Sequence, residues 1–167
     1  KLRRVVNCLR GTKQMCLTLE ADDLQVIKRW IDASFAVHKD MRSHTGGTMS
    51  LGRGSACSTS IRQKLTTKSS AEAELVGVDD VMPMVLWTRQ FTEGQGHVIR
   101  EKNGQQSSTK RTRHLDVRCF FVTDRIKANQ LTMEHCPTGD MWADPFTKPL
   151  QGAAFYKFRK LILNLQD

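Results

Sequence analysis

The stretch Trp30-Ile31-Asp32-Ala33-Ser34-Phe35-Ala36 is the part of the sequence from which the fold can be worked out. Its bulky apolar residues favour a half-buried β-strand. Because side chains alternate along a strand, Asp32 shares one face with Trp30 and Ser34. Aspartate is depleted in strands, since its side chain competes for the hydrogen bonds of the backbone. Asp32 therefore either has a local structural role or faces a metal ion.

Composition indicates one domain with a basic surface. A chain of 167 residues is long enough for a single core, and no apolar run approaches the length of a membrane span. The net charge is +9 and the pI about 9.6, which suits either a polyphosphate partner or a generally solvated basic face. Aromatic content of only 7% argues against a single-strand binder that works by base stacking. Basic side chains cluster at 1–4, 110–113 and 157–160.

The cysteines and the start of the chain bear on its setting. Five cysteines are scattered without any CxxC spacing, which favours free thiols in a reducing compartment over disulfides or zinc. The sequence opens at Lys1 with neither an initiator Met nor a signal-like segment, so we expect a piece of a longer polypeptide.

A three-stranded antiparallel meander is predicted for the first half of the chain, after a short helix and an extended piece within residues 1–20. The strand that holds Asp32 is expected to run to about Val37. The other strands are expected at 48–51 and 55–61, and the turns at 45–47 and 52–54.

A long helix should follow the meander. Ser69-Ser70-Ala71-Glu72 matches a capping box. Apolar residues then recur at helical spacing in a stripe that includes Glu74 but not Glu72. Glu74 is thus either a functional carboxylate or an edge-of-stripe residue paired with Lys or Arg. Pro83 predicts a kink in this helix.

Further elements are predicted in the second half from the same kind of pattern. These are a helix over Leu115–Ile126, a strand over Leu131–Cys136, a short helical turn at Asp140–Asp144 broken at Pro145, and an amphipathic helix over Phe155–Leu165.

Five stretches, in this order, closely resemble the ribonuclease H domain at the C-terminal end of Ty1/copia-type retrotransposon Pol polyproteins. The stretch Leu9–Thr12 is also similar to the junction that precedes this domain, so residues 1–20 would be the tail of the reverse transcriptase connection and 21–167 the ribonuclease H-like domain. The resemblance covers nearly the whole chain. The five stretches are Asp32-Ala33-Ser34-Phe35, Ser43-His44-Thr45-Gly46-Gly47, Lys68-Ser69-Ser70-Ala71-Glu72-Ala73-Glu74, Lys110-Arg111-Thr112-Arg113-His114-Leu115-Asp116 and Ala143-Asp144-Pro145-Phe146-Thr147-Lys148-Pro149-Leu150.

The resemblance implies an α/β fold with a mixed sheet, in which parallel strands join the meander and helices flank it. It also implies hydrolysis of the RNA strand of RNA–DNA hybrids with two magnesium ions, or manganese in their place. Two such ions about 3.5–4 Å apart clamp the attacking and leaving oxygens of a phosphodiester, and they need rigidly held carboxylates. By resemblance these ligands are Asp32, Glu74 and Asp144, with Glu72 as the alternative to Glu74.

The resemblance also implies partners. The RNA–DNA hybrid would be read by shape and 2′-hydroxyls, without base specificity, and we expect Lys68, Lys110, Arg111 and Arg113 to contact its backbone. His114 could be a general acid–base, but its place in the basic motif favours a structural or substrate-contact role. The other expected partner is the reverse transcriptase domain of the same polyprotein, in a cytoplasmic virus-like particle or the nucleus, with no membrane involved.

The sequence departs from the family pattern at a fourth carboxylate, an Asp in a Gln-Asp-Asn-type motif after the long helix. Residues 94–100 lead directly into Glu101-Lys102-Asn103-Gly104, so about ten residues, one strand with its turn, are missing. We expect impaired catalysis, unless Glu101 substitutes. The alternative is a catalytically inactive nucleic-acid-binding remnant. The sheet beside Asp32 would be patched by His97–Arg100 or left open, and the gap is either decay or a lost piece of the gene model.

Overall fold

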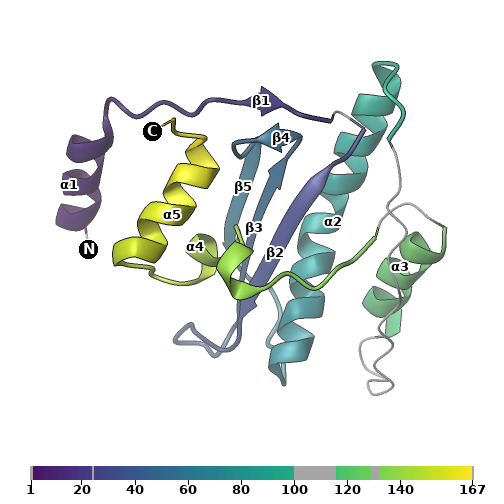
Figure 1. The fold of residues 1–167 in the computed structure, drawn as a ribbon. Helices are drawn as coiled ribbons and strands as arrows, with labels where there is room; N and C mark the ends of the chain where they lie inside the picture. The colour runs from purple at the N-terminus through teal and green to yellow at the C-terminus, as the bar shows by residue number, and fades with distance from the viewer. Residues whose placement is uncertain (1, 24, 100–115, 129–131, 167) are drawn as a thin grey trace.

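The computed structural model describes residues 2–23, 25–99, 116–128 and 132–166, which form one α/β body (Figure 1). Its helices and strands, in chain order, are α1 (Leu2–Thr12), β1 (Glu20–Ala21), β2 (Lys28–Ser34), β3 (His44–Ser50), β4 (Gly52–Arg53), β5 (Cys57–Arg62), α2 (Ser70–Gly94), α3 (Asp116–Lys127), the 3-10 turn η1 (Thr138–Asp140), α4 (Asp144–Thr147) and α5 (Gly152–Leu163).

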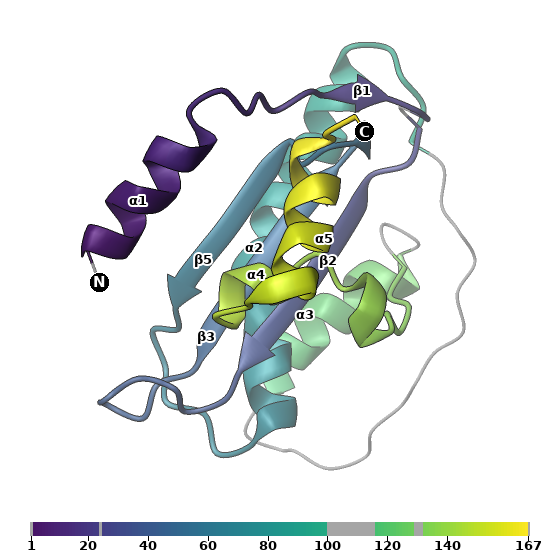
Figure 2. The ribbon, with the colours of Figure 1, turned by 60° about the vertical axis from the view of Figure 1, so that its left-hand side comes forward.

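The predicted meander is confirmed. Strands β2, β3 and β5 form an antiparallel sheet in the order β2-β3-β5 (Figure 2), and β1 pairs with β4 in a separate small ladder. In this register Asp32 lies opposite Gly46, and Gly46 lies opposite Ser60. Strand β2 ends at Ser34, earlier than the predicted Val37, because the chain turns at Ala36, whose φ is 52°.

Strand β3 begins at His44, so the prediction of a turn at 45–47 is wrong. Glycine suggested a turn, yet here it allows close packing on both faces of the strand. A Cβ on Gly46 would lie 2.6 Å from Cγ2 of Thr147, and one on Gly47 would lie 3.0 Å from Nη2 of Arg29. Gly46 thus lets α4 rest directly on the sheet.

Helix α2 starts as predicted and buries Val78, Val81 and Met82 of the expected stripe, but its first turns bury another side. The Ser69 hydroxyl accepts the Glu72 backbone N–H at 3.1 Å, and the helix runs through Pro83 to Gly94 without a break. Glu74 is exposed, so its placement on the apolar stripe is wrong. The buried side includes two small residues, Ala73 and Gly77, whose low hydrophobicity hid it from the pattern.

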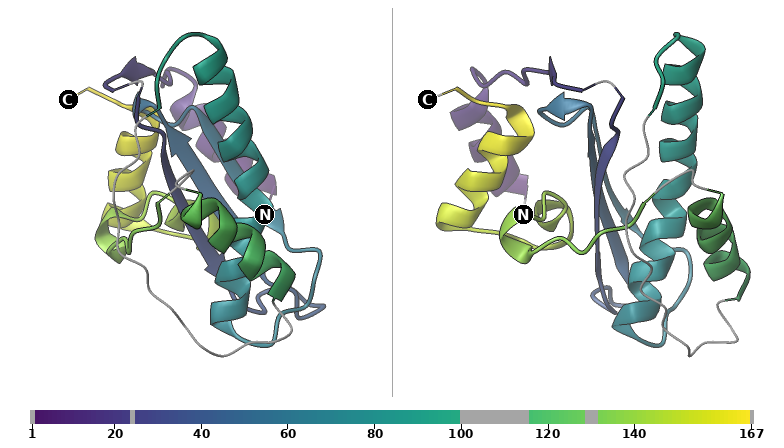
Figure 3. Two further views of the ribbon diagram at one scale, coloured as in Figure 1. Left: turned by 90° about the vertical axis from the view of Figure 1, so that its right-hand side faces the viewer. Right: turned by 45° about the vertical axis from the view of Figure 1, so that its right-hand side comes forward.

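The core lies between α2, α3 and the sheet face that α2 covers. Val78 and Met82 of α2 pack with Val122 of α3, and Ile31 of β2 packs against this cluster. Figure 3 shows the resulting layers: α2 and α3 lie on one side of the sheet, and α4 and α5 on the other. Ile31 and Asp32, being adjacent in β2, therefore face different layers.

The second half of the chain matches the prediction in its two longer helices, but not in its strand or in the helical turn predicted at 140–144, which is replaced by η1 and α4. Helix α3 coincides with the helix predicted at 115–126, within the residues described, and α5 begins and ends slightly earlier than expected. Residues 132–136 are irregular, so the strand predicted at 131–136 is not formed there. Pro145 lies in the first turn of α4 and does not break it, because the first turn of a helix needs no N–H donor from proline.

The outer edge of β2 has no strand beside it in the described part of the chain. Residues 97–99, which would patch that edge on one of the two alternatives, have no regular structure. All strand pairs that the structure describes are antiparallel, so the expected parallel strands are not found among these residues.

The structure also bears on the predictions about membrane spans and cysteines. No helix of the described residues is both long enough and apolar enough to cross a bilayer. Cys8, Cys16, Cys57 and Cys136 are free thiols, as predicted, while the side chain of Cys119 lies outside the described residues.

Replacing Gly46 by Ala tests the close approach of α4 to the sheet. The added methyl would collide with Thr147 and with Cβ of Phe146 at 3.0 Å, so we expect a loss of about 1–3 kcal/mol in the free energy of unfolding, the usual cost of overpacking. Urea unfolding measures this. Gly139→Ala is the matched control, because a Cβ there meets nothing within 4 Å; equal effects of the two substitutions would contradict the packing account.

Candidate metal site

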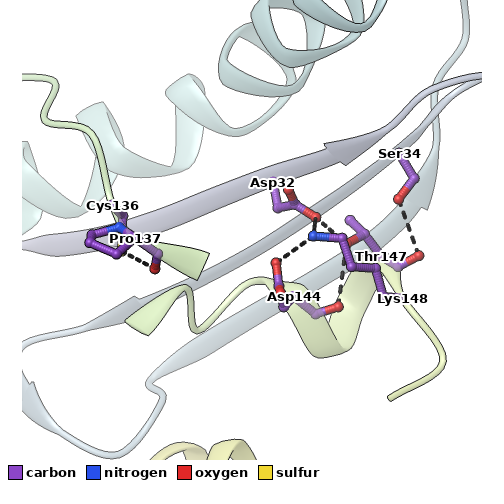
Figure 4. A network of polar contacts seen from close by, with 7 residues as sticks. All are labelled: Asp32, Ser34, Cys136, Pro137, Asp144, Thr147 and Lys148. Carbon is purple, nitrogen blue, oxygen red and sulfur yellow. Dashed lines mark hydrogen bonds and ion pairs between the residues drawn. The ribbon is translucent and has the colours of Figure 1, made fainter. Parts of the chain in front are cut away.

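Two carboxylates from distant parts of the sequence meet on the sheet face that α4 and α5 cover. Asp32 projects from β2, and Asp144 is the first residue of α4. Their side chains are 18% and 4% exposed, respectively. Figure 4 shows both side chains turned toward the same small volume between strand and helix. The meeting of Asp32 and Asp144, expected from the resemblance, is present in the structure.

The short helix α4 brings two further polar side chains to Asp32. Residues at i, i+3 and i+4 of a helix share one side, which places Thr147 and Lys148 beside Asp144. The Thr147 hydroxyl donates a hydrogen bond to Oδ2 of Asp32. The Ser34 hydroxyl donates to the Thr147 carbonyl oxygen at 3.3 Å. Strand β2 is thus joined to α4 at two successive positions of one face.

Lys148 lies between the two carboxylates. Its Nζ is 2.7 Å from Oδ1 of Asp144 and 3.3 Å from Oδ2 of Asp32. Burial acts to lower the pKa of Lys148, but the hydrogen bond to Asp144 and the charges of Asp32 and Asp144 outweigh it, so the pKa lies above its ordinary value. The ammonium is therefore charged at neutral pH, and it neutralises part of the negative charge of the pair.

Glu74 and its alternative Glu72 do not join this pair. Glu74 is exposed on α2, the helix that covers the opposite face of the sheet. Glu72 accepts the Lys68 backbone N–H at 2.6 Å and so serves the start of α2. Glu101 lies outside the described residues. Within the described ranges, no group of three or more His, Cys, Asp or Glu side chains could hold a metal ion.

The donor set that the described residues supply therefore does not fit two magnesium ions. Such a centre needs several carboxylate oxygens, because magnesium demands near-octahedral oxygen coordination. The described residues supply two carboxylates, and an ammonium already contacts both. A single divalent ion would have to share or take the place of Lys148.

Lys68 is the one predicted nucleic-acid contact that the structure describes, and it is exposed just before α2. Lys110, Arg111, Arg113 and His114 lie outside the described residues.

Aromatic stacking fixes the segment that leads into α4. The rings of Trp30 and Trp142 stack with centroids 4.4 Å apart and planes 4° apart. Burial, with the nearby charges of Asp140 and Asp144, raises the pKa of the Cys136 thiol, so this cysteine is a poor metal ligand.

Thr147 and Lys148 were not predicted as site residues from the sequence. The signal that could have found them is their i+3 and i+4 spacing from Asp144.

A second polar chain lies at the end of the same sheet face. His38 Nε2 is 3.0 Å from His44 Nδ1, and His44 Nε2 is 2.9 Å from the Ser60 hydroxyl. That hydroxyl donates to the Phe146 carbonyl oxygen of α4 at 2.8 Å. Burial lowers the pKa of His44 and the neighbouring His38 lowers it further, while the Phe146 backbone contact raises it; the net pKa lies below the ordinary 6.5.

Comparisons with known proteins point to retroelements. The chain is 25% identical over 173 residues to the retrovirus-related Pol polyprotein from transposon TNT 1-94 of Nicotiana tabacum, with 95% of this chain and 13% of that protein covered. It is 27% identical over 177 residues, and 26% over 175, to the Pol polyproteins from transposons RE1 and RE2 of Arabidopsis thaliana, each with 96% of this chain and 12% of the relative covered. No family model and no solved structure matches the chain.

Two facts follow from these alignments. The chain spans about an eighth of the length of the curated relatives it matches. The alignments run over 173 to 177 positions while they cover 95–96% of a 167-residue chain. The relatives therefore carry residues in this region that have no counterpart here.

The histidine chain predicts a pH dependence of stability. Because folding lowers the pKa of His44, the unfolded chain takes up a proton near pH 6.5 while the folded chain resists it. Stability is therefore fully present above that pH and falls as the pH drops below it. Urea unfolding across this range should show the loss, and His44→Gln should reduce it. The exposed His97→Gln serves as control; if that variant flattens the profile equally, His44 is not the cause.

Proposed function

We propose that this chain is the ribonuclease H-like segment of a retroelement Pol polyprotein, and that it binds RNA–DNA hybrids but hydrolyses them poorly. The observation that carries the proposal is the meeting of Asp32 and Asp144 on one sheet face, where Lys148 contacts both carboxylates. Asp32 and Asp144, two of the expected metal ligands, lie within reach of one lysine, whereas Glu74 is exposed on α2.

The order of elements supports the first half of the proposal. An antiparallel meander whose first strand bears Asp32 leads into a long helix, and a late short helix brings back Asp144. Similarity to three retrotransposon Pol polyproteins covers 95–96% of the chain. On this proposal residues 1–20 continue from the reverse transcriptase part, and the segment acts inside the particle or nucleus where reverse transcription takes place.

The donor set supports the second half. When two divalent ions are bound in such a centre, they stabilise the attacking and leaving oxygens of a phosphodiester. The described residues do not fit such a pair, because Glu74 is exposed on another layer and Lys148 contacts both remaining carboxylates. The residues that the relatives carry and this chain lacks are consistent with a lost strand and its carboxylate.

Charge supports the substrate class. The chain carries +9, and a polyphosphate partner releases counterions when such a surface neutralises its phosphates. Because binding uses backbone contacts and needs no metal centre, we expect it to survive the loss of ligands. A catalytically inactive nucleic-acid-binding remnant is the second candidate, favoured by the same Lys148 contacts.

The test is binding and cleavage of one labelled RNA–DNA hybrid by the wild-type chain and by Asp32→Asn. We expect both to bind the hybrid, with an affinity that falls about a thousandfold or more between roughly 50 and 200 mM salt if six or more phosphates are contacted. With magnesium, cleavage by the wild-type chain should exceed that by Asp32→Asn only slightly, and equal background for the two would favour the inactive remnant.

Two results would contradict the proposal. Magnesium-dependent cleavage far above background that Asp32→Asn abolishes would show a complete centre and would refute the claim of impairment. Binding of duplex DNA of the same sequence, with no measurable binding of the hybrid, would refute the assignment of the substrate class.

A further inference from the structure

We propose that Lys148 is a built-in cation that occupies the carboxylate pair, so that a divalent ion binds Asp32 and Asp144 only by displacing it. This inference concerns the regulation of the site and rests on the proposed function for the identity of that site. Figure 4 shows the contacts of Lys148 with Asp32 and Asp144 that support it.

The position of the ammonium is the first argument. Nζ of Lys148 contacts Oδ1 of Asp144 and Oδ2 of Asp32 at hydrogen-bonding or ion-pairing distance, so it bridges the pair as a shared cation would. Oδ2 of Asp32 also accepts from Thr147. The oxygens that face the centre of the pair are thus already engaged by side chains of this chain.

Access is the second argument. The side chain of Asp144 is 4% exposed and that of Asp32 18%, whereas that of Lys148 is 42% exposed. Lys148 is therefore the solvent-facing member of the trio. An ion that arrives from solvent therefore meets the ammonium before it meets the oxygens of Asp144.

The charge balance is the third argument. Two carboxylates at close range repel each other unless a cation lies between them, and removing one partner from a buried pair leaves an uncompensated charge. Lys148 follows α4 directly and its backbone N–H bonds to the Asp144 carbonyl oxygen at 2.9 Å. The ammonium is therefore held near the pair intramolecularly, an advantage that a free ion lacks.

The contact between Lys157 and Asp140 differs from the Lys148 contacts in its exposure to solvent. Lys157 lies 3.4 Å from Asp140, but there the carboxylate is 72% exposed and the contact is a surface pair. Such pairs add little to stability. Lys157→Met is thus a matched control for Lys148→Met: the same chemical change, at a lysine that bridges no buried carboxylates.

The experiment compares the full chain with its Lys148→Met and Lys148→Gln variants by two measurements that do not involve nuclease activity. Manganese binding is followed by the loss of its free-ion EPR signal, and thermal unfolding is recorded in EDTA and in magnesium. We expect wild type to bind manganese weakly and to show the same Tm in both solutions. Both variants should bind manganese on the order of ten- to a hundredfold more tightly, the worth of the charge-assisted hydrogen bonds that the ammonium no longer makes.

The melting temperatures of the Lys148 variants should depend on magnesium, unlike that of wild type. Each Lys148 variant should melt lower than wild type in EDTA and regain the loss in magnesium, because a ligand that binds only the folded state stabilises it. Adding Asp144→Asn to Lys148→Met should remove the gain, and Lys157→Met should behave like wild type. A variant that is unfolded in EDTA but folds with magnesium would also support the inference.

The inference is wrong if wild type binds manganese as tightly as both variants, or if the variants are destabilised equally with and without magnesium. Lys148 would then be a structural clamp only. Hybrid binding by wild type in EDTA, measured on the same preparation, separates this failure from a failure of the proposed function, since it requires neither a metal nor a change at Lys148.

Discussion

The ionic contact of Lys148 with Asp32 and Asp144 joins two parts of the chain that are far apart in the sequence. It ties the meander, which forms early in the sequence, to a one-turn helix near the end. The approach is close because Gly46 presents no side chain to α4. Without the ammonium, two poorly solvated carboxylates would face each other, with the Thr147 hydroxyl bonded to Asp32 but no cation from Lys148 between them. The arrangement of α4 on the sheet therefore depends on this charge balance.

The opposite layer is held by a different kind of interaction. Val78 and Met82 of α2 and Val122 of α3 form a small apolar cluster, while much of the buried surface of β3 is polar. Thr45 and Gln63, both fully buried, are hydrogen-bonded to each other at 3.0 Å. Among the described residues β2 is an edge strand, and an uncovered edge exposes unpaired backbone groups. Among the described residues, β2, which bears Asp32, therefore has one edge without a strand beside it.

Several features of the fold and the site could be predicted from the sequence. The cap at Ser69, the meander and the convergence of Asp32 with Asp144 follow from residue types, alternation and resemblance. It failed where tertiary packing overrides local preference. Gly46 was expected in a turn but serves close packing in a strand, and the small residues beside Glu74 concealed the true buried face of α2. Residues 132–136 have strand-forming composition, yet no strand pairs with them in the described part of the chain.

The most direct test of the central claim is a crystal structure of the wild-type chain grown with manganese, with anomalous differences measured at the Asp32–Asp144 pair. Our account predicts no manganese peak between the two carboxylates and a Lys148 ammonium in contact with both. A manganese peak bound to Asp32 and Asp144 in the wild-type chain, with Lys148 turned out to solvent, would contradict it.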